Sequence, residues 1–419
     1  MNKFMDFFQE KLVPPLVKLG NQRHLKAVRN GLSLTIPFVV VGSLFLILSS
    51  LPFKWWKGFI GSYAAKLSAP VNATFGVLAL LAVIGIGYSL AKDYELDPIS
   101  GAIISVVGFL LTQLTPKYQL DTGKFGAEGL FTAIIIALVA VEIYRFFVTK
   151  GIIIKMPEGV PPAIASSFAA LLPGGAVILL VWVIRVVLGF DITAFLSTLF
   201  SPLVFALNTL PGILIFTVFG CLLWAVGIHG DSIMGSIGTP ILLQYLTANS
   251  AAFLAGEPIP YITAAGFGSM FINIGGTGAT IAIAILMVKS RSEVYKSLGK
   301  LCLPSAIFEI NEPIMFGFPV VLNPLMLIPF ILTPAVLTVG TYLLMYFDII
   351  ARPVTMVPWT MPPVIGPFLT TGGDWRAAVW SAISVILAVL IYYPFFKTAE
   401  KQQIQNEKEE KVSGKTAEA

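Results

Sequence analysis

The sequence predicts an all-α polytopic membrane protein, with about ten transmembrane helices, re-entrant hairpins and interfacial amphipathic helices. Of its 419 residues, 56% are hydrophobic and only 12% are charged, about half the charged share of a soluble globular protein. Charge-free windows of roughly 20 residues recur along the chain, and that length crosses about 30 Å of hydrocarbon. Because lipid offers no hydrogen bonds, each window should form a helix that satisfies its own backbone.

The expected crossings follow from these windows in chain order. The segment 129–147 adds a further candidate, broken only by Glu142 and Arg145, and the longest windows can hold more than one element. The charge-free windows are 31–53, 71–91, 98–116, 159–184, 192–228, 258–288, 324–347 and 377–396.

Both ends of the chain are predicted to be cytoplasmic, which makes the number of crossings even. Residues 1–30 are too long and too basic for the start of a cleaved signal peptide, and their excess of Lys and Arg marks a cytoplasmic segment. Apolar residues alternate with those cations, which suits an amphipathic helix on the inner membrane surface. Residues 399–419 have mixed charge and no apolar periodicity, so we expect a disordered tail.

Several chemistries find no support in the composition. Cys221 and Cys302 lie far apart in apolar segments, which favours packing over a disulfide or a metal site. The chain has no GxxxxGK[ST], CxxC or HExxH motif, so we expect neither a pump ATPase nor a metal or other cofactor. The net charge of +5 belongs to loops, since no basic stripe with interleaved aromatics predicts a nucleic-acid partner.

The membrane region divides into two parts of different character. Residues 31–190 alternate apolar helices with short charged connections and should form a transmembrane scaffold. Residues 191–398 form a second domain that is poor in cations, with no Lys or Arg from Val186 to Val288 or from Leu301 to Ala351. The basic connection 289–300 between these stretches should be cytoplasmic.

Helix breakers interrupt two apolar runs of the second domain. One run contains INIGGTGAT, residues 272–280, and the other, 301–347, contains six prolines at positions 304, 313, 319, 324, 329 and 334. Proline removes a backbone donor and clashes one turn back, so 301–347 should not be a straight helix. Such irregular backbone is tolerated in a membrane only where protein or a water-filled cavity surrounds it, which predicts re-entrant hairpins and a substrate site.

Two carboxylates, Glu309 and Glu312, lie within FEINEPIMFG, residues 308–317. A carboxylate at membrane depth is costly and normally faces a cavity or a partner, which makes it a candidate functional group. Pro313 suits the first position of a helix, leaving Glu312 at the cap, where it would accept a hydrogen bond from a ligand hydroxyl or only from helix N–H groups. Glu309 has the weaker case and would equally well point to solvent.

The other polar candidates lie near further breaks in the helices. His229 and Asp231, in WAVGIHGDSIMG (224–235), lie between glycines where the backbone should leave a helix; His229 would be either a satisfied core residue or a ligand-binding group. Trp359, in MVPWTMPP (356–363), would stack on a sugar ring or anchor the chain at the membrane interface. The remaining candidates for hydroxyl recognition are Asn72, Asn273, Thr277 and Asn311, while His24 is predicted to be a surface group.

Three motifs in this order, GIHGDSIMGS, INEPIMFGFPVVLNP and VPWTMPP, give the chain a family resemblance over roughly residues 5–398. It resembles the membrane permease, enzyme IIC, of the bacterial phosphoenolpyruvate-dependent sugar phosphotransferase system, in its lactose, cellobiose and diacetylchitobiose family. The resemblance implies a homodimer in the cytoplasmic membrane with ten transmembrane helices and two re-entrant hairpins. The N-terminal half would form the dimer scaffold, and the C-terminal half would bind the sugar.

The resemblance also implies roles for individual residues. The family's binding glutamate falls on Glu312, its histidine on His229 and its sugar-stacking tryptophan on Trp359. A phosphocysteine of enzyme IIB would phosphorylate the sugar's 6-hydroxyl, with either Glu312 or His229 accepting the proton. Neither cysteine here lies in a IIB-like setting, so IIB and IIA are expected to be separate soluble proteins that dock on the cytoplasmic face. The cation-poor second domain fits a neutral β-linked disaccharide, although cavity width, which would select among them, cannot be read from the sequence.

Two rival functions remain open at this point. Glu312 and His229 would also serve as the proton relay of a secondary sugar transporter coupled to an ion gradient. Alternatively, His229 and Asp231 would act as base and orienting group of an intramembrane transferase, although the sequence has no visible donor-binding motif. If the accumulated sugar is phosphorylated and uptake needs enzyme IIB, the chain is a phosphotransferase permease and neither of these two rivals.

Overall fold

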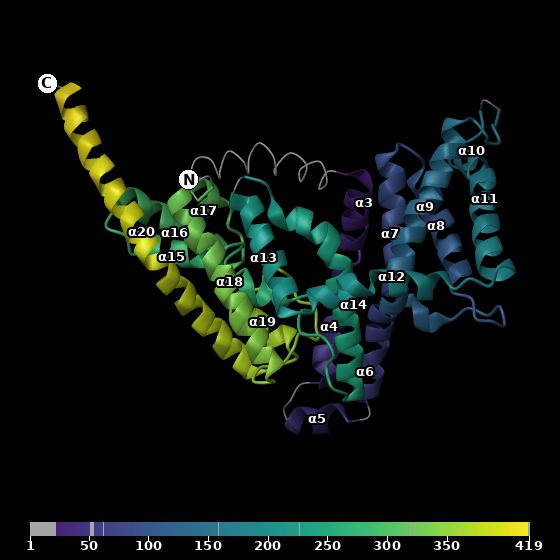
Figure 1. Cartoon of the computed structure of the whole chain (residues 1–419), viewed down its shortest axis with the longest axis horizontal. Coiled ribbons are helices and arrows are strands. Elements are labelled where there is room, and N and C mark those ends of the chain that lie inside the picture. The colour runs from purple at the N-terminus through teal and green to yellow at the C-terminus, as the bar shows by residue number, and fades with distance from the viewer. Residues whose placement is uncertain are drawn as a thin grey trace. The chain divides into compact units, whose positions relative to one another are not determined.

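The computed structural model describes residues 22–50, 54–61, 63–157, 159–225, 227–318, 320–321 and 323–417, and within these ranges it has helices and no β-strand. An all-α fold is therefore confirmed for the described chain (Figure 1). Most of the amphipathic segment predicted over residues 1–30 lies outside the described residues.

The chain forms two compact units, each with its own packing. Of the described residues, the first unit comprises Leu207–Met234 and 261–417, and the second comprises 22–206 and Gly235–Pro260. Both units are built from separate stretches of sequence, because the segment 235–260 belongs to the second unit although it follows the start of the first.

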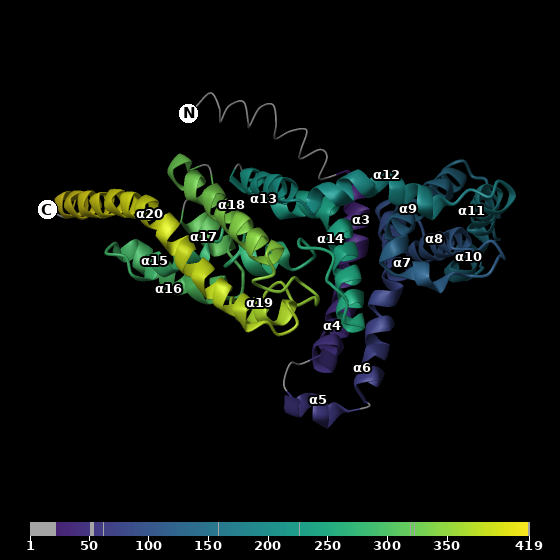
Figure 2. The same ribbon diagram turned by 60° about the horizontal axis from the view of Figure 1, so that its bottom comes forward.

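The second unit is a helical bundle in which α7 packs against α3, α8 and α9 (Figure 2). Close backbone approach explains part of this packing: a Cβ on Gly85 would lie 2.4 Å from the Gly31 carbonyl oxygen, so glycine allows α3 and α7 to touch. The start of α8 is fixed by Asp97, whose carboxylate accepts the Ser100 N–H at 2.8 Å. The helices are α3 (Arg23–Ser33), α4 (Ile36–Ser50), α5 (Lys54–Ile60), α6 (Tyr63–Asn72), α7 (Leu78–Asp93), α8 (Pro98–Thr112), α9 (Leu130–Thr149), α10 (Pro162–Ala169), α11 (Leu171–Trp182) and α12 (Ile192–Leu207), whose last residue belongs to the first unit.

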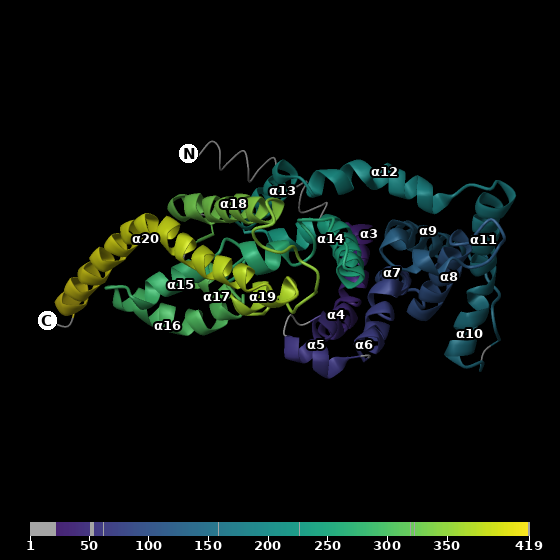
Figure 3. The ribbon, with the colours of Figure 1, turned by 90° about the horizontal axis from the view of Figure 1, so that it is seen from below.

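The first unit contains both short and long helices. In Figure 3, α15 and α16 lie together, and α20 runs beside α18, in agreement with the contacts of these pairs. With 8 residues, α15 is only about 12 Å long, less than half of a membrane crossing. The helices are α13 (Leu210–Ala225), the start of α14 (Gly230–Ala255), α15 (Ile281–Val288), α16 (Glu293–Ile307), α17 (Glu312–Gly317), α18 (Pro324–Tyr346), α19 (Ile365–Thr370) and α20 (Trp375–Ala417).

Fewer helices than the ten expected crossings are long and apolar enough to span a membrane. In the described chain six qualify, or seven if α12 and α13 count as one broken span. The lower number reflects the length criterion, because some charge-free windows hold shorter helices: the window 98–116 contains the 15-residue α8, and 258–288 contains the 8-residue α15. The qualifying segments are Arg23–Ser49, Lys66–Asp93, Ala127–Thr149, Ile164–Val187, Pro324–Tyr346 and Trp375–Glu409.

The run 301–347 is not a straight helix, as its prolines predict. It contains the end of α16, the short α17 and α18, with non-helical breaks between them. Pro324 opens α18, where its missing N–H costs nothing. Pro329 and Pro334 nevertheless lie inside α18, so only some of the prolines break the chain.

The predicted disordered tail is wrong for the residues described. Helix α20 continues to Ala417, through most of the stretch 399–419. The sequence there is rich in Gln, Glu and Lys, which are good helix formers. Glu400 also binds the connection between α15 and α16, accepting the Ser290 hydroxyl at 2.6 Å and the Arg291 N–H at 2.8 Å. Glu407 binds the start of α16, accepting the Val294 N–H at 3.3 Å.

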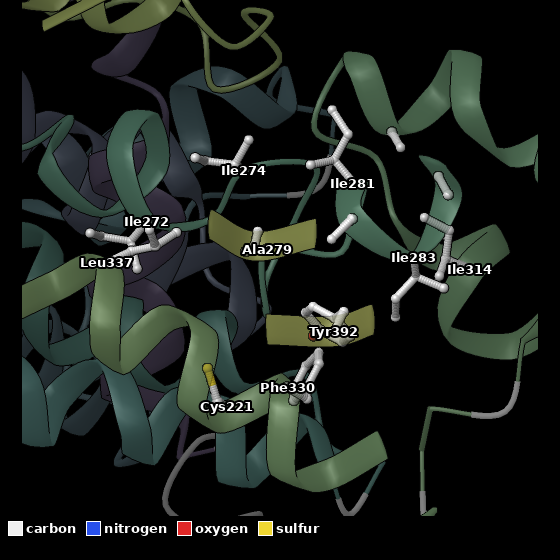
Figure 4. Close-up of a cluster of buried hydrophobic side chains, with 14 of the residues drawn as sticks. Cys221, Ile272, Ile274, Ala279, Ile281, Ile283, Ile314, Phe330, Leu337 and Tyr392 are labelled. Carbon is white, nitrogen blue, oxygen red and sulfur yellow. The ribbon is translucent and has the colours of Figure 1, made fainter. Parts of the chain in front are cut away.

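The core of the first unit encloses the glycine-containing segment. Figure 4 shows Ala279 among apolar side chains from several helices. Cys221 comes from α13, Phe330 and Leu337 from α18, and Tyr392 from α20, and all four side chains are buried. An irregular segment is therefore held inside protein, as its backbone requires.

Candidate functional site

The segment Asn273–Thr280, called here the glycine loop, has a backbone that needs its glycines. Gly275, Gly276 and Gly278 have φ values of +76°, +94° and +88°, which only glycine adopts without cost. The space beside them is also closed, since a Cβ on Gly276 would lie 2.4 Å from Asn311 and one on Gly278 would lie 2.2 Å from the Phe330 ring. The loop therefore presses its backbone directly against neighbouring side chains.

Glu309 binds this loop and does not point to solvent. It lies in the break between α16 and α17 with φ of +66° and is only 8% exposed. A single carboxylate oxygen, Oε2, accepts the backbone N–H of Gly275 at 2.5 Å and that of Gly276 at 3.1 Å. Because the carboxyl group is buried and accepts hydrogen bonds from the loop, the solvent-facing alternative for Glu309 is wrong.

Asn311 makes a second link from the same break to the glycine loop. Its amide Nδ2 donates to the Thr277 carbonyl oxygen at 3.0 Å and to the Thr280 hydroxyl at 3.2 Å. The side chain is 5% exposed. The donors of Asn311 are therefore committed to the protein.

Glu312 differs from both of these residues because its side chain is exposed. It is the first residue of α17, with Asn311 as the N-cap, so Pro313 occupies the second helical position rather than the predicted first. Within the described residues no hydrogen bond to the Glu312 carboxylate forms. The arrangement thus gives no support to the reading of Glu312 as a helix cap, and it leaves the carboxylate available to a ligand.

The His229 turn, residues 224–232, joins the end of α13 to the start of α14. Asp231 Oδ2 accepts the Trp224 indole N–H at 3.1 Å and also accepts the hydroxyl of Thr277, which fixes the turn to the glycine loop. The rings of Trp224 and His229 are 4.4 Å apart. Asp231 and Thr277, two separate candidates from the sequence, are therefore bonded to each other, and His229 lies in the same turn as Asp231.

The hydrogen bonds of His229 define its tautomer. The Ser232 backbone N–H lies 3.3 Å from Nδ1, and the Ser232 hydroxyl lies 3.1 Å from the same atom. A backbone N–H can only donate, so Nδ1 accepts and the ring proton of this arrangement is on Nε2. The Nε2–H edge of the exposed ring is therefore the edge that can donate to a ligand.

Two further predicted ligand residues, Trp359 and Asn72, have no hydrogen bond to this network in the described part of the chain. Trp359 lies on a non-helical segment, as expected, and is 60% exposed. Asn72 is the exposed last residue of α6 and belongs to the second unit. Neither residue has a hydrogen bond to the glycine loop among the described residues.

Some residues that bond to the His229 turn or to the glycine loop were not identified from the sequence. Trp224, five residues before His229, is buried and binds Asp231, and the only available signal was its place in the same motif. Tyr392 donates to the Gly278 carbonyl oxygen at 2.7 Å from a distant helix. His24 is not a simple surface group, since its Nε2 lies 2.8 Å from a Glu142 carboxylate oxygen.

Comparison with known proteins gives these motifs a family. The family profile described as "Phosphotransferase system, EIIC" matches residues 29–334. The chain is 42% identical to the "Putative permease IIC component YwbA" of Bacillus subtilis (strain 168), over 97% of this chain and 98% of that protein. It is 39% identical to the "PTS system cellobiose-specific EIIC component" of Geobacillus stearothermophilus, over 97% of this chain and 96% of that protein.

A solved structure agrees with these relatives. The crystal structure of the transporter ChbC, described as the IIC component from the N,N'-diacetylchitobiose-specific phosphotransferase system, matches with a TM-score of 0.92 at 40% identity. The match covers 96% of this chain and 99% of that one. Profile, relatives and structure agree with the motifs around His229 and Glu312, and the chain therefore belongs to the membrane-embedded EIIC family of the phosphotransferase system.

Proposed function

We propose that this chain binds a neutral β-linked disaccharide, of the cellobiose, diacetylchitobiose or lactose type, and translocates it for phosphorylation by enzyme IIB. The names of its relatives support this sugar class, since one is called cellobiose-specific and ChbC is called diacetylchitobiose-specific. The absence of Lys and Arg from 186–288 and from 301–351 supports a neutral ligand, because an anionic sugar would need a cation in its site.

The observation that carries the site assignment is the contrast between Glu312 and its neighbours. Glu309 and Asn311 are buried, and their polar groups form hydrogen bonds with the glycine loop. Glu312 is exposed at the same break. An exposed carboxylate on a rigidly anchored segment can accept a hydrogen bond from a sugar hydroxyl, and Trp359 and the Asp231–Thr277 pair would supply further contacts.

The hydrogen bonds of His229 favour one division of labour between the two central residues. In the reaction, the sugar's 6-hydroxyl oxygen attacks the phosphorus of the IIB phosphocysteine, the S–P bond breaks and the thiolate leaves. Since His229 presents Nε2–H, it would donate to a sugar oxygen rather than take the proton. Glu312 would then orient the 6-hydroxyl and accept its proton.

The assembly around this site follows from the family. We expect a homodimer embedded in membrane lipid, with residues 31–190 as the scaffold and dimerisation domain and 191–398 as the transport domain. Both termini would face the cytoplasm, where soluble IIB and IIA proteins would dock. The basic connection 289–300 fits that side of the membrane.

The test is binding and phosphorylation by the purified protein. We expect cellobiose, diacetylchitobiose or lactose to bind, and the bound sugar to be phosphorylated after addition of IIA, IIB and the phosphate-donating proteins. Glu312→Gln should abolish phosphorylation, because the amide cannot take a proton, while leaving an extractable protein. Near-normal phosphorylation by Glu312→Gln would contradict the assignment.

A further inference from the structure

We propose that Glu309 is a positioning residue of this permease: it fixes the break that carries Glu312 to the glycine loop, and through that loop to the His229 turn. The inference rests on the proposed function, because it assigns a task to a buried carboxylate that the transfer itself does not use. It concerns the placement of Glu312 and not a contact with sugar.

The first step of the argument is that Glu309 is too enclosed to serve the ligand directly. It is 8% exposed, and its Oε2 already accepts two backbone N–H groups, from Gly275 and Gly276. Its backbone has a φ of +66°, a conformation that costs a non-glycine residue free energy and persists when surrounding contacts hold it. The two hydrogen bonds to the glycine loop are contacts of that kind.

The second step is that the break is tied to the loop at two points. Glu309 holds the N–H groups at 275 and 276, and Asn311 holds the Thr277 carbonyl oxygen. Glu312 follows Asn311 directly and precedes Pro313, whose ring restricts the backbone of the residue before it. The exposed carboxylate is therefore attached to a segment with little freedom.

The third step is that the same loop is bonded to the His229 turn. The hydroxyl of Thr277 donates to Asp231, and Asp231 also accepts the Trp224 indole N–H, with the Trp224 ring beside that of His229. A continuous bonded path thus runs from the Glu312 break, through Glu309 and the glycine loop, to the turn that bears His229. Loss of the Glu309 link would let the two reacting side chains drift relative to each other.

The test uses three substitutions that separate side-chain length from the presence of a carboxyl group. Glu309→Ala removes the acceptor, and Glu309→Asp keeps the carboxyl group but shortens the side chain by one methylene. Glu309→Gln is neutral but keeps the length, and because both N–H groups go to one oxygen, one amide oxygen can replace it. Sugar affinity and the rate of phosphorylation at saturating sugar are measured on each purified protein, together with thermal stability.

We expect Glu309→Ala and Glu309→Asp to lower the saturated phosphorylation rate by about 10- to 100-fold, the loss expected from a small misplacement of a reacting group. Glu309→Gln should have a rate within about fivefold of that of the unmodified protein, since an amide oxygen accepts the same two hydrogen bonds only somewhat more weakly than a carboxyl oxygen. A normal rate in folded Glu309→Asp, or a Glu309→Gln protein as slow as Glu309→Asp, would overturn the proposal.

Asn208 provides a matched control in the same unit. Its Oδ1 also accepts two consecutive backbone N–H groups, of Ile262 at 2.9 Å and Thr263 at 3.3 Å, but within the described chain Asn208 has no hydrogen bond to the glycine loop. Asn208→Ala should lower thermal stability without changing the saturated rate, and an equal loss of rate in this variant would contradict a specific role for Glu309. Glu312→Gln distinguishes failure of the proposed function from failure of the positioning role. Phosphorylation by Glu312→Gln would refute the proposed site. If Glu312→Gln is inactive but Glu309→Asp is fully active, only the positioning role of Glu309 is refuted.

Discussion

At the scale of single residues, burial and hydrogen bonding separate groups that the sequence makes look alike. Glu309 and Glu312 are three residues apart in one apolar run, yet the first is buried against Gly275 and Gly276 and the second is exposed. The sequence predicted that Glu312 matters through its place beside Pro313. It could not predict the role of Glu309, because the partners that bury it lie more than 30 residues away in the chain.

The predicted stacking of Trp359 on a sugar ring can be tested by substitution. The side chain is 60% exposed, so Trp359→Ala should change the free energy of unfolding by less than about 0.5 kcal/mol. If its ring stacks on a sugar, the same change should weaken sugar binding about tenfold, or about 1.4 kcal/mol. Calorimetric titration with the preferred disaccharide measures this.

Trp375 is the control for that experiment, because it is also a solvent-exposed tryptophan, 67% exposed at the start of α20. Trp375→Ala should leave sugar affinity unchanged. Unchanged affinity in Trp359→Ala as well would make Trp359 an interfacial anchor.

At the scale of elements, the glycine loop is the part on which the site depends. It is bonded to the Glu309 break, to the His229 turn through Thr277, and to α20 through the Tyr392 hydroxyl. The pattern INIGGTGAT predicted irregular backbone at this point, and the structure has it. The pattern could not predict which helices enclose the loop, since those contacts come from α13, α17, α18 and α20.

The tight packing of the loop gives a stability prediction. Gly276→Ala would place a Cβ 2.4 Å from Asn311 at a φ of +94°. Overpacking costs about 1–3 kcal/mol and left-handed backbone about 1–2 kcal/mol more, so we expect a loss of roughly 2–5 kcal/mol in the free energy of unfolding. Thermal unfolding in detergent checks this against Gly268→Ala, where an added Cβ meets nothing within 4 Å; equal stability of the two variants would show that the loop has room.

The end of α20 is the element for which sequence pattern failed. Its polar composition resembles that of a disordered segment, but Glu407 binds the start of α16, accepting the Glu293 N–H at 3.4 Å and the Val294 N–H at 3.3 Å. The start of α16 lies more than 100 residues from Glu407 in the chain, so the local pattern of apolar residues cannot predict this contact.

A capping role for Glu407 is directly measurable. Loss of a helix cap costs about 1 kcal/mol, which corresponds to roughly fivefold faster opening. Glu407→Ala should therefore speed amide exchange at Glu293 and Val294, whose N–H groups Glu407 accepts. Glu409→Ala is the matched control, because Glu409 is exposed and its carboxylate pairs with Gln405 one turn earlier. Exchange that is unchanged in Glu407→Ala, or equally raised in Glu409→Ala, would rule out the anchor.

At the scale of the whole molecule, the sequence predicted the fold class and the family, but not which apolar segments form long helices and which form short ones. Low charge and long apolar windows predicted an all-α membrane protein, and the motifs around His229 and Glu312 indicated the family. The count of about ten spans exceeded the six or seven helices that qualify by length and composition. The difference arises because charge-free sequence occurs both in full spans and in short helices such as α15 that are buried in protein.

The most direct test of the account is sugar uptake into vesicles that contain this protein, with IIA, IIB and the phosphate-donating proteins inside. We predict that a β-linked disaccharide accumulates as its 6-phosphate, that a proton uncoupler has no effect, and that Glu312→Gln abolishes accumulation. Accumulation of unmodified sugar that the uncoupler stops, or normal sugar phosphate formation in Glu312→Gln, would contradict it.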